Sequence, residues 1–352
     1  MEFLPVLDPL DHPKVGIWYS LIPSGSAPGV SVGHNCVFFP SKVGVRGKIL
    51  IVGGANPSGS FSDTYAINLD DYEWNTLEWK CLKPRYEHCT FVTESNPQTL
   101  WVFGGAQQCG NRNCLQNIDL NDDEPQWNSI VVKGEPPNAR TYHTNSACIG
   151  DRLYVFSGGE SGAVPVSDSR LHVFDTVSST WSQPETEGRQ PAARHGHIIV
   201  AIALQSTFME GWLEINFTMT CTLLTQVMRL KWEKVRTKGD IPPGVAAHSA
   251  VVLGPNIYIF GGLTADGAIN SMHKFNTERK QWVLVKFEGD MPPNRLDHSM
   301  CLIPWQLHGE KNGDEQQAHK SEASDIINLA FVFGGMDTHG VIHNDCVVTV
   351  VK

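Results

Sequence analysis

The sequence has 352 residues, of which 41% are hydrophobic and 18% charged, and its formal net charge is −10. This composition is that of a globular protein with enough apolar residues for a large core. The acidic balance argues against nucleic acid and against an anionic membrane surface as direct partners, because neither attracts a negatively charged protein. The apolar runs are far shorter than the roughly 18 residues of a membrane span, so we expect no direct membrane insertion.

The beginning of the chain and its cysteines favour a cytoplasmic protein. The first residues are acidic and are interrupted by Pro5, which is unlike a secretory signal. The nine cysteines form no Cys-x-x-Cys pair. We therefore expect reduced thiols in the cytosol, with neither a disulfide framework nor a metal site.

The first predicted strand, Trp18–Leu21, stands alone at the start of the chain. It carries the first of six tryptophans that recur at intervals of 50 to 56 residues, and no repeat unit precedes it. The last unit begins at His298 and ends in the apolar strand Cys346–Val351, with no tryptophan strand after it. We predict that the N-terminal strand completes this last sheet, which would protect edges that otherwise invite aggregation.

Short runs of β-branched and aromatic residues end in double glycines five times along the chain. Each run is typical of a buried strand, and glycine at its end permits unusual backbone angles and close approach of a neighbouring chain. The five pairs are Gly53-Gly54, Gly104-Gly105, Gly158-Gly159, Gly261-Gly262 and Gly334-Gly335.

Histidines and tryptophans repeat with the same period, near 50 residues. The six histidines, each at the start of a predicted strand, are His34, His88, His143, His197, His248 and His298. The six tryptophans are Trp18, Trp74, Trp127, Trp181, Trp232 and Trp282. An arginine lies three residues before the histidine in four units, and Ser31 and Val245 take its place in the other two.

A period near 50 with several short strands in each unit is the signature of kelch repeats. One such sheet cannot bury both of its faces, so the units must pack radially. We predict an all-β protein, a six-bladed kelch β-propeller that forms a single domain over residues 1–352.

Two segments depart from the pattern. Residues 306–325 form a polar, mostly acidic insertion between the first two strands of blade six, which we expect to be a solvated loop. In residues 201–230 the expected double glycine is missing: Gly211 stands without a pair, and Leu223, Leu224, Val227 and Leu230 fall at helical spacing. We therefore predict that blade four is disrupted there and has lost its middle strands.

The residues that could perform chemistry follow the repeat and so favour a structural role. A histidine present once in each blade serves the packing of each blade, so we expect no metal, no cofactor and no catalytic residue. Ser31 lies in a Gly-x-Ser-x-Gly pattern, but a loop precedes it and a strand follows, unlike a nucleophile elbow. An alternative is a kelch-type propeller enzyme, a metal-dependent oxidase or lyase, and another is a substrate-binding adaptor of a larger complex.

Several segments resemble one family in particular, the Rab-nine effector proteins with kelch motifs. The resemblance is carried by residues 51–57, 84–88, 110–116, 296–305 and 345–351. It implies a non-catalytic scaffold that binds a small Rab GTPase in its GTP form, together with other trafficking proteins. It further implies transport from late endosomes to the trans-Golgi network, with peripheral association with endosomal membranes through partners.

Loops on a rigid scaffold are where partners are usually bound. In residues 107–113 of blade two, Arg112 is a long cation between Asn111 and Asn113, and arginine is enriched in interfaces. We predict that these three residues contact the partner, although an ordinary polar turn would have the same composition.

Overall fold

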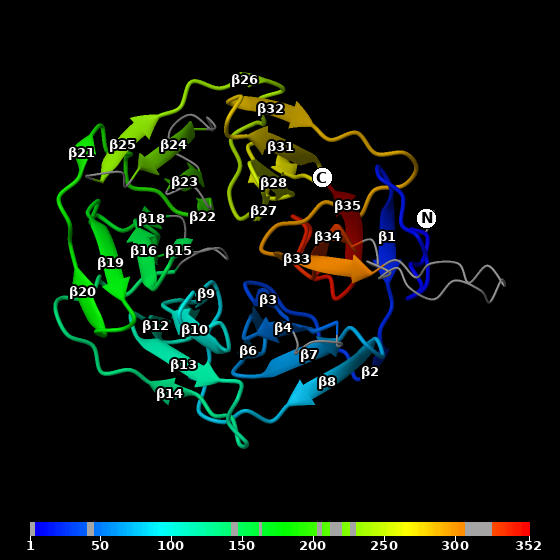
Figure 1. Ribbon diagram of the computed structural model, residues 1–352, viewed down its shortest axis with the longest axis horizontal. Helices are drawn as coiled ribbons and strands as arrows, with labels where there is room; N and C mark the ends of the chain where they lie inside the picture. Colours follow the sequence, from blue (N-terminus) through cyan, green and yellow to red (C-terminus); the bar gives the residue numbers. More distant parts are fainter. Residues whose placement is uncertain are drawn as a thin grey trace, which may run out of the picture.

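The computed structural model of the chain describes residues 4–40, 46–141, 147–161, 164–202, 206–211, 220–225, 230–306 and 326–352. None of the described segments is a helix, so this part of the chain holds no helix long and apolar enough to cross a membrane. Within the described residues, six sheets of four or five strands stand around a common axis (Figure 1). We number these blades in chain order.

In each blade four strands run outward from the axis with antiparallel pairing, and we count them in that order (Figure 1). In blades one, four and five a further strand of two residues pairs in parallel with the outermost of the four. Blade one contains β2 (Ser24–Gly25), β3 (Asn35–Phe39), β4 (Lys48–Val52), β7 (Thr64–Asn68) and β8 (Glu73–Leu77). Blade two contains β9 (Cys89–Val92), β10 (Thr99–Phe103), β13 (Leu115–Asp119) and β14 (Asn128–Ser129). Blade three contains β15 (Ala147–Ile149), β16 (Arg152–Phe156), β19 (Leu171–Asp175) and β20 (Thr180–Ser182).

The second half of the chain repeats this arrangement. Blade four contains β21 (Glu187–Gly188), β22 (Ile198–Ile202), β23 (Ser206–Gly211), β24 (Thr220–Thr225) and β25 (Lys231–Lys234). Blade five contains β26 (Lys238–Gly239), β27 (Ser249–Leu253), β28 (Asn256–Phe260), β31 (Met272–Asn276) and β32 (Gln281–Leu284). Blade six contains β33 (Ser299–Gln306), β34 (Ile326–Phe333), β35 (Cys346–Val351) and β1 (Trp18–Leu21).

The two ends of the chain meet in blade six, as predicted. Strand β1 pairs antiparallel with β35, and Trp18 lies opposite Thr349 while Leu21 lies opposite Cys346. The hydroxyl of Thr349 also donates to the backbone oxygen of Ile17 at 2.8 Å. The ring is therefore closed by hydrogen bonds between the first and the last strand, and the kelch propeller class is confirmed.

The core lies between neighbouring blades. In four blades a phenylalanine ends the second strand from the axis, and in all four its ring packs on the tryptophan of the following blade. The ring centroids are 5.2 Å apart for Phe103 and Trp181 and 4.8 Å apart for Phe260 and Trp18. All six repeating tryptophans are at most 4% exposed. The tryptophans are therefore anchors of the blade interfaces, because each joins two sheets that could not bury these faces alone.

The double glycines make room for the repeating histidines. A Cβ on Gly334 of blade six would lie 2.6 Å from Nε2 of His34 in blade one, and a Cβ on Gly261 would lie 2.7 Å from Cε1 of His298 in the next blade. Both glycines also have positive φ, 63° and 66°. A larger residue at Gly334 or Gly261 would press on the histidine of the next blade, which explains why the glycines recur with the histidines.

In blade three the double glycine Gly158-Gly159 is offset by one residue from the double glycines of the other blades. Gly158 is the counterpart of Gly105, the second glycine of the blade-two pair. The N–H of Gly158 donates to the backbone oxygen of Arg194, just as the N–H of Gly105 donates to that of Arg140. Ser157 therefore takes the place of the first glycine, with φ of 54°. Its hydroxyl donates to the oxygen of Arg194 at 2.8 Å, a bond that helps to hold this left-handed backbone.

Blade four keeps its middle strands, and the prediction that it has lost them is wrong. Strand β23 pairs antiparallel with β22 on one side and with β24 on the other, so Leu223 and Leu224 lie in a strand and not in a helix. The two middle strands are hydrogen-bonded between β22 and β25, and this pairing overrides the weak helical pattern of the local sequence. Glu210 lies opposite Ile198, as Phe103 lies opposite Cys89 in blade two, so Glu210 takes the place of the phenylalanine in this blade.

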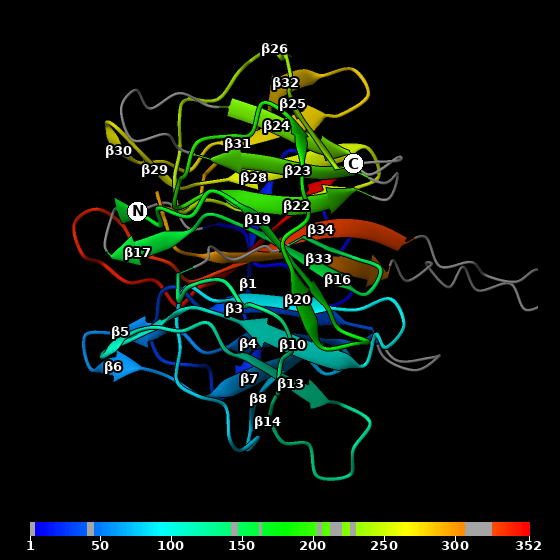
Figure 2. The ribbon, with the colours of Figure 1, turned by 90° about the vertical axis from the view of Figure 1, so that its left-hand side faces the viewer.

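Several features of the sequence lie outside the described residues. They include most of the insertion at 307–325, His143 of blade three, and parts of the 201–230 segment. The ends of β33 and β34 that flank the insertion lie on the side of the ring opposite the small hairpins described below (Figure 2).

Candidate interaction surface

Four small hairpins project from one side of the ring, each between the second and third strands of a blade (Figure 2). They are β5–β6 (Ala55–Asn56 and Gly59–Ser60), β11–β12 (Ala106–Gln107 and Gly110–Asn111), β17–β18 (Gly159–Ser161 and Val164–Pro165) and β29–β30 (Leu263–Thr264 and Gly267–Ala268). Blade four has no counterpart among its described residues. Because the sheets hold the bases of these hairpins, this hairpin side is a set of loops on a rigid ring.

Backbone hydrogen bonds link the blades near the axis of this same side. The residue before each described marker histidine has positive φ, and in four of these five blades its N–H bonds to its counterpart in the preceding blade. The N–H groups of Glu87, Ala247 and Asp297 donate to the oxygens of Gly33, Gly196 and Ala247 at 2.7, 3.0 and 3.0 Å. The N–H of Gly33 donates to Asp297 at 3.1 Å, across the closure between blades six and one. The hairpins therefore rest on blades whose mutual positions are fixed.

The three residues predicted to bind a partner all belong to the blade-two hairpin and its return. The Asn111 side chain donates to the oxygens of Gly159 and Glu160, at 3.1 and 2.8 Å, and so ties this hairpin to that of blade three. Asn113 donates in the same way to Pro137 at 3.1 Å.

Arg112 is partly buried and binds within its own blade. Its Nε donates to the oxygen of Pro84 at 3.2 Å, and its Nη2 donates to the side-chain oxygen of Gln107. These contacts set the shape of the loop and leave its apex, residues 108–110, exposed. A role of the three residues in partner binding stays a prediction.

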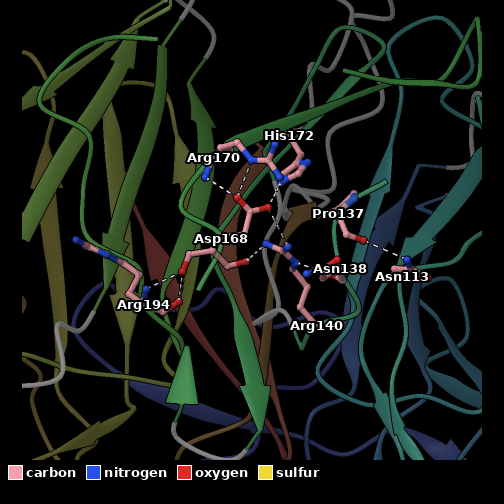
Figure 3. Close-up of polar contacts among 9 residues, drawn as sticks. Asn113, Pro137, Asn138, Arg140, Asp168, Arg170, His172 and Arg194 are labelled. Atoms are coloured by element: carbon pink, nitrogen blue, oxygen red, sulfur yellow. Dashed lines mark hydrogen bonds and ion pairs between the residues drawn. The ribbon is translucent and has the colours of Figure 1, made fainter. Parts of the chain in front are cut away.

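Beside this hairpin, blade three contains a partly buried polar network centred on Asp168 (Figure 3). The Asp168 carboxylate accepts a hydrogen bond from Arg170 at 3.0 Å and contacts Nε2 of His172 at 2.6 Å. It also lies 3.7 Å from Nη2 of Arg140, a fully buried side chain whose Nη1 donates to Ser157 at 2.9 Å. Burial alone would raise the pKa of Asp168, but the bonds from Arg170 and His172 outweigh it and hold the pKa at about 2.

The arginines of the Arg-x-x-His motif have equivalent anchors in other blades. Arg85 donates to the side chain of Gln116 at 2.5 Å and to the oxygen of Gly104 at 3.2 Å. Arg295 binds both carboxylate oxygens of Asp345 at 2.9 Å and the oxygen of Gly334 at 3.0 Å. The repeated arginine thus satisfies the backbone where the second strand ends, which is a structural role.

The five repeating histidines with described side chains are buried. Burial lowers the pKa of His34 to about 4. It also lowers the pKa values of His88 and His298 far below the usual range, and the nearby guanidinium groups of Arg85 and Arg295 add to this effect. Such side chains pack the ring and are unsuited to exchange protons with a substrate at neutral pH.

We expect these histidines to make the fold sensitive to acid. In the unfolded chain they take up protons near pH 6.5, whereas in the folded ring they stay neutral to lower pH. Their contribution to the free energy of unfolding is therefore complete above about pH 6.5 and is lost as the pH falls toward about 4. For the three imidazoles together, the free energy of unfolding should fall with a slope of up to about 4 kcal/mol per pH unit. Urea unfolding between pH 7.5 and 4.5 would measure this slope.

The substitution His34→Gln provides the control for the acid prediction, because glutamine has no proton to gain. It should reduce the slope by up to about one third, whatever its effect on stability at pH 7.5. A free energy of unfolding that stays constant from pH 7 to pH 5 would contradict the prediction.

The residues considered for catalysis or metal binding lie in surroundings that favour a structural role. Ser31 is 5% exposed and lies against Gly54, and the chain continues through a β-bridge at Val32 into strand β3. No group of three or more His, Cys, Asp or Glu side chains in the described part of the chain is placed to hold a metal ion. The eight cysteines with described side chains are unpaired thiols.

The fold and its repeated contacts define a kelch-repeat protein. In agreement, residues 33–262 and 219–308 match the family model described as the KLHDC2/KLHL20/DRC7 Kelch-repeats domain. Among curated relatives, the Rab9 effector protein with kelch motifs of Danio rerio is 54% identical over 359 residues, which cover 99% of each chain.

Two mammalian relatives bear the same name. That of Mus musculus is 43% identical over 374 residues, covering 100% of this chain and 98% of the relative. That of Homo sapiens is 44% identical over 374 residues, covering 100% of both. The chain belongs to the family of Rab9 effector proteins with kelch motifs.

Proposed function

We propose that this protein is a non-catalytic scaffold that acts as an effector of a small Rab GTPase. The observation that carries the proposal is the 54% identity, over 99% of both chains, to a relative named as a Rab9 effector. The architecture supports it, because a rigid ring with projecting loops presents a surface for another protein. The repeated His and Arg side chains are engaged in contacts within the propeller, which favours a binding role over catalysis.

We further propose that the chain binds the GTP form of the GTPase and acts in transport from late endosomes to the trans-Golgi network. An effector must distinguish the two nucleotide states to transmit a signal, and it does so by differential affinity. The chain would be cytoplasmic and would reach endosomal membranes through its partners, since its net charge of −10 offers no attraction to anionic lipids.

The hairpin side is the surface that we propose for the GTPase, with residues 107–113 as part of the contact. The apex of this loop is exposed, while Asn111 and Asn113 hold it against blade three. A loop that is fixed before binding loses little conformational entropy in a complex, which favours affinity.

Binding of the purified chain to a Rab9-type GTPase loaded with a non-hydrolysable GTP analogue or with GDP would test the proposal by calorimetry. We expect at least tenfold tighter binding of the GTP form, and weaker binding after Arg112→Ala. The conservative Arg112→Lys variant and an Arg279→Ala variant on blade five serve as controls. Equal affinity for both nucleotide forms would refute the effector role, and an unchanged affinity of Arg112→Ala would refute only the contact assigned to Arg112.

A further inference from the structure

A cleft opens between blades one and two on the side of the ring opposite the hairpins. Its cavity volume is about 1030 Å³. Lys48 at the start of β4 and Asn68 at the end of β7 line the cleft, whereas the blade-one hairpin follows the opposite end of β4. The cleft is therefore separate from the surface proposed above for the GTPase.

The floor of the cleft is apolar. Phe39 and Ala66 are buried beneath it, and Leu77 and Leu120 remain partly exposed in its walls, one from each blade. All four belong to the hydrophobic cluster that joins blades one and two. The cleft is thus an open end of a blade interface, with room for an additional apolar side chain.

Amide side chains surround this floor. Asn75, Gln98 and Asn121 line the cleft and supply both donors and acceptors, whereas the amide of Asn68 is bound to Asp71 and to the N–H of Asp70. Asn75 and Asn121 are exposed, and Asn75 donates only a 3.3 Å bond to the oxygen of Glu73. Such groups suit a ligand with many backbone N–H and C=O groups, as an extended peptide has.

The rim of the cleft is acidic. Asp70 lines it and Asp71 follows, and on the blade-two side Asp122, Asp123 and Glu124 come directly after Asn121, all of them exposed. These five carboxylates would attract a cationic ligand and repel phosphate groups.

Among the described residues, two cations lie close to these acids, and both are engaged. Lys48 lines the cleft with its ammonium 5.8 Å from the centroid of the Trp79 ring, and its burial lowers its pKa. Arg46 donates from its Nη1 to the hydroxyl of Tyr72 at 3.2 Å. In the described part of the chain the acids therefore outnumber the cations around the opening.

We propose that this cleft binds an extended, basic peptide segment of a second protein partner. One apolar side chain of the peptide enters between Leu77 and Leu120, the amide side chains bind its backbone, and its lysines or arginines face the acidic rim. The protein would then hold two partners on opposite sides of one ring. The inference does not depend on the identity of the GTPase or on its binding.

The test uses the full-length chain and an array of synthetic nonapeptides. Each peptide carries four lysines or arginines around a central leucine or phenylalanine, and matched peptides carry glutamates in place of the cations or serine in place of the apolar residue. We expect the basic apolar peptides to bind at least tenfold more tightly than either matched set, and this preference to weaken as salt rises from 50 to 300 mM.

Two variants locate the binding. Asn75→Trp fills the cleft from an exposed position and should reduce affinity at least tenfold. Its control is Asn128→Trp, at an exposed asparagine in the outermost strand of blade two that makes the same bond to the residue two before it, at 3.2 Å. That control should bind as the unmodified chain does.

Variants that remove charge from the acidic rim test the electrostatic contribution to peptide binding. Asp122→Asn, Asp123→Asn and Glu124→Gln together should reduce affinity about threefold or more at low salt, whereas Glu233→Gln, Glu278→Gln and Glu288→Gln together should not. GTPase binding should be unchanged in every one of these variants. Failure of the basic peptides to bind more tightly than the glutamate peptides, or unchanged affinity of Asn75→Trp, would overturn the proposal.

Discussion

A chain that lacks residues 1–22 is expected to lose its cooperative unfolding transition. The deletion removes β1 and leaves one edge of β35 without a partner. It also removes Leu7, Trp18 and Leu21 from two core clusters, in which they are at most 4% exposed. Burial of three such side chains contributes about 5–9 kcal/mol, which is comparable to the entire stability of a typical protein. Calorimetry and near-ultraviolet circular dichroism would measure the loss.

A peptide of residues 1–22 added in trans provides the control for this deletion. Its binding should restore the transition, because the missing strand can pair again with β35, and the same peptide with Trp18→Ala should restore much less. A truncated chain that unfolds at the same temperature as the complete one would show that blade six does not need β1. The closure described above would then contribute nothing to stability.

The substitution Trp181→Ala should lower the free energy of unfolding by about 3–5 kcal/mol. The Trp181 side chain is 3% exposed and contacts three rings, at centroid distances of 5.2 Å to Phe103, 5.1 Å to Phe174 and 6.5 Å to His172. Its loss leaves a cavity between blades two and three that neither sheet can close by itself. Chemical denaturation of the purified variant would measure the change.

Trp79→Ala is the matched control, since Trp79 is partly exposed and packs at the border of the cluster between blades one and two. We expect it to cost only about 1–2 kcal/mol, because less apolar surface is lost to water. Similar costs for Trp79→Ala and Trp181→Ala would mean that the repeating tryptophans are not special anchors of the ring.

Much of the fold could be predicted because its markers recur. The spacing of His34, His88 and their counterparts gives the extent of each blade, and an isolated strand at Trp18 implies closure with the last one. The errors arose where one residue type replaced another. Ser157 replaces a glycine in blade three, and only its φ of 54° and its bond to Arg194 reveal the equivalence. In blade four, pairing with neighbouring strands overrode the local pattern.

The candidate sites were harder to predict than the fold. Asn111 and Asn113 were selected as polar residues in a turn, but the sequence does not reveal that both bind backbone oxygens of the next blade. The cleft was missed completely. Its two walls come from Leu77 and Leu120, which belong to different blades, and no motif connects them.

The sequence by itself determined the repeat, the strand that closes the ring and the family, because each of these depends on residue types at regular spacing. The tertiary structure alone decided which side chains are consumed by contacts between blades and where the surface remains open. Those properties depend on residues that are distant in the chain and adjacent in space. Asn111, which binds blade three, and Asn75, which remains exposed beside a cleft, are the same residue type in neighbouring blades. Only the packing of the blades gives them different surroundings.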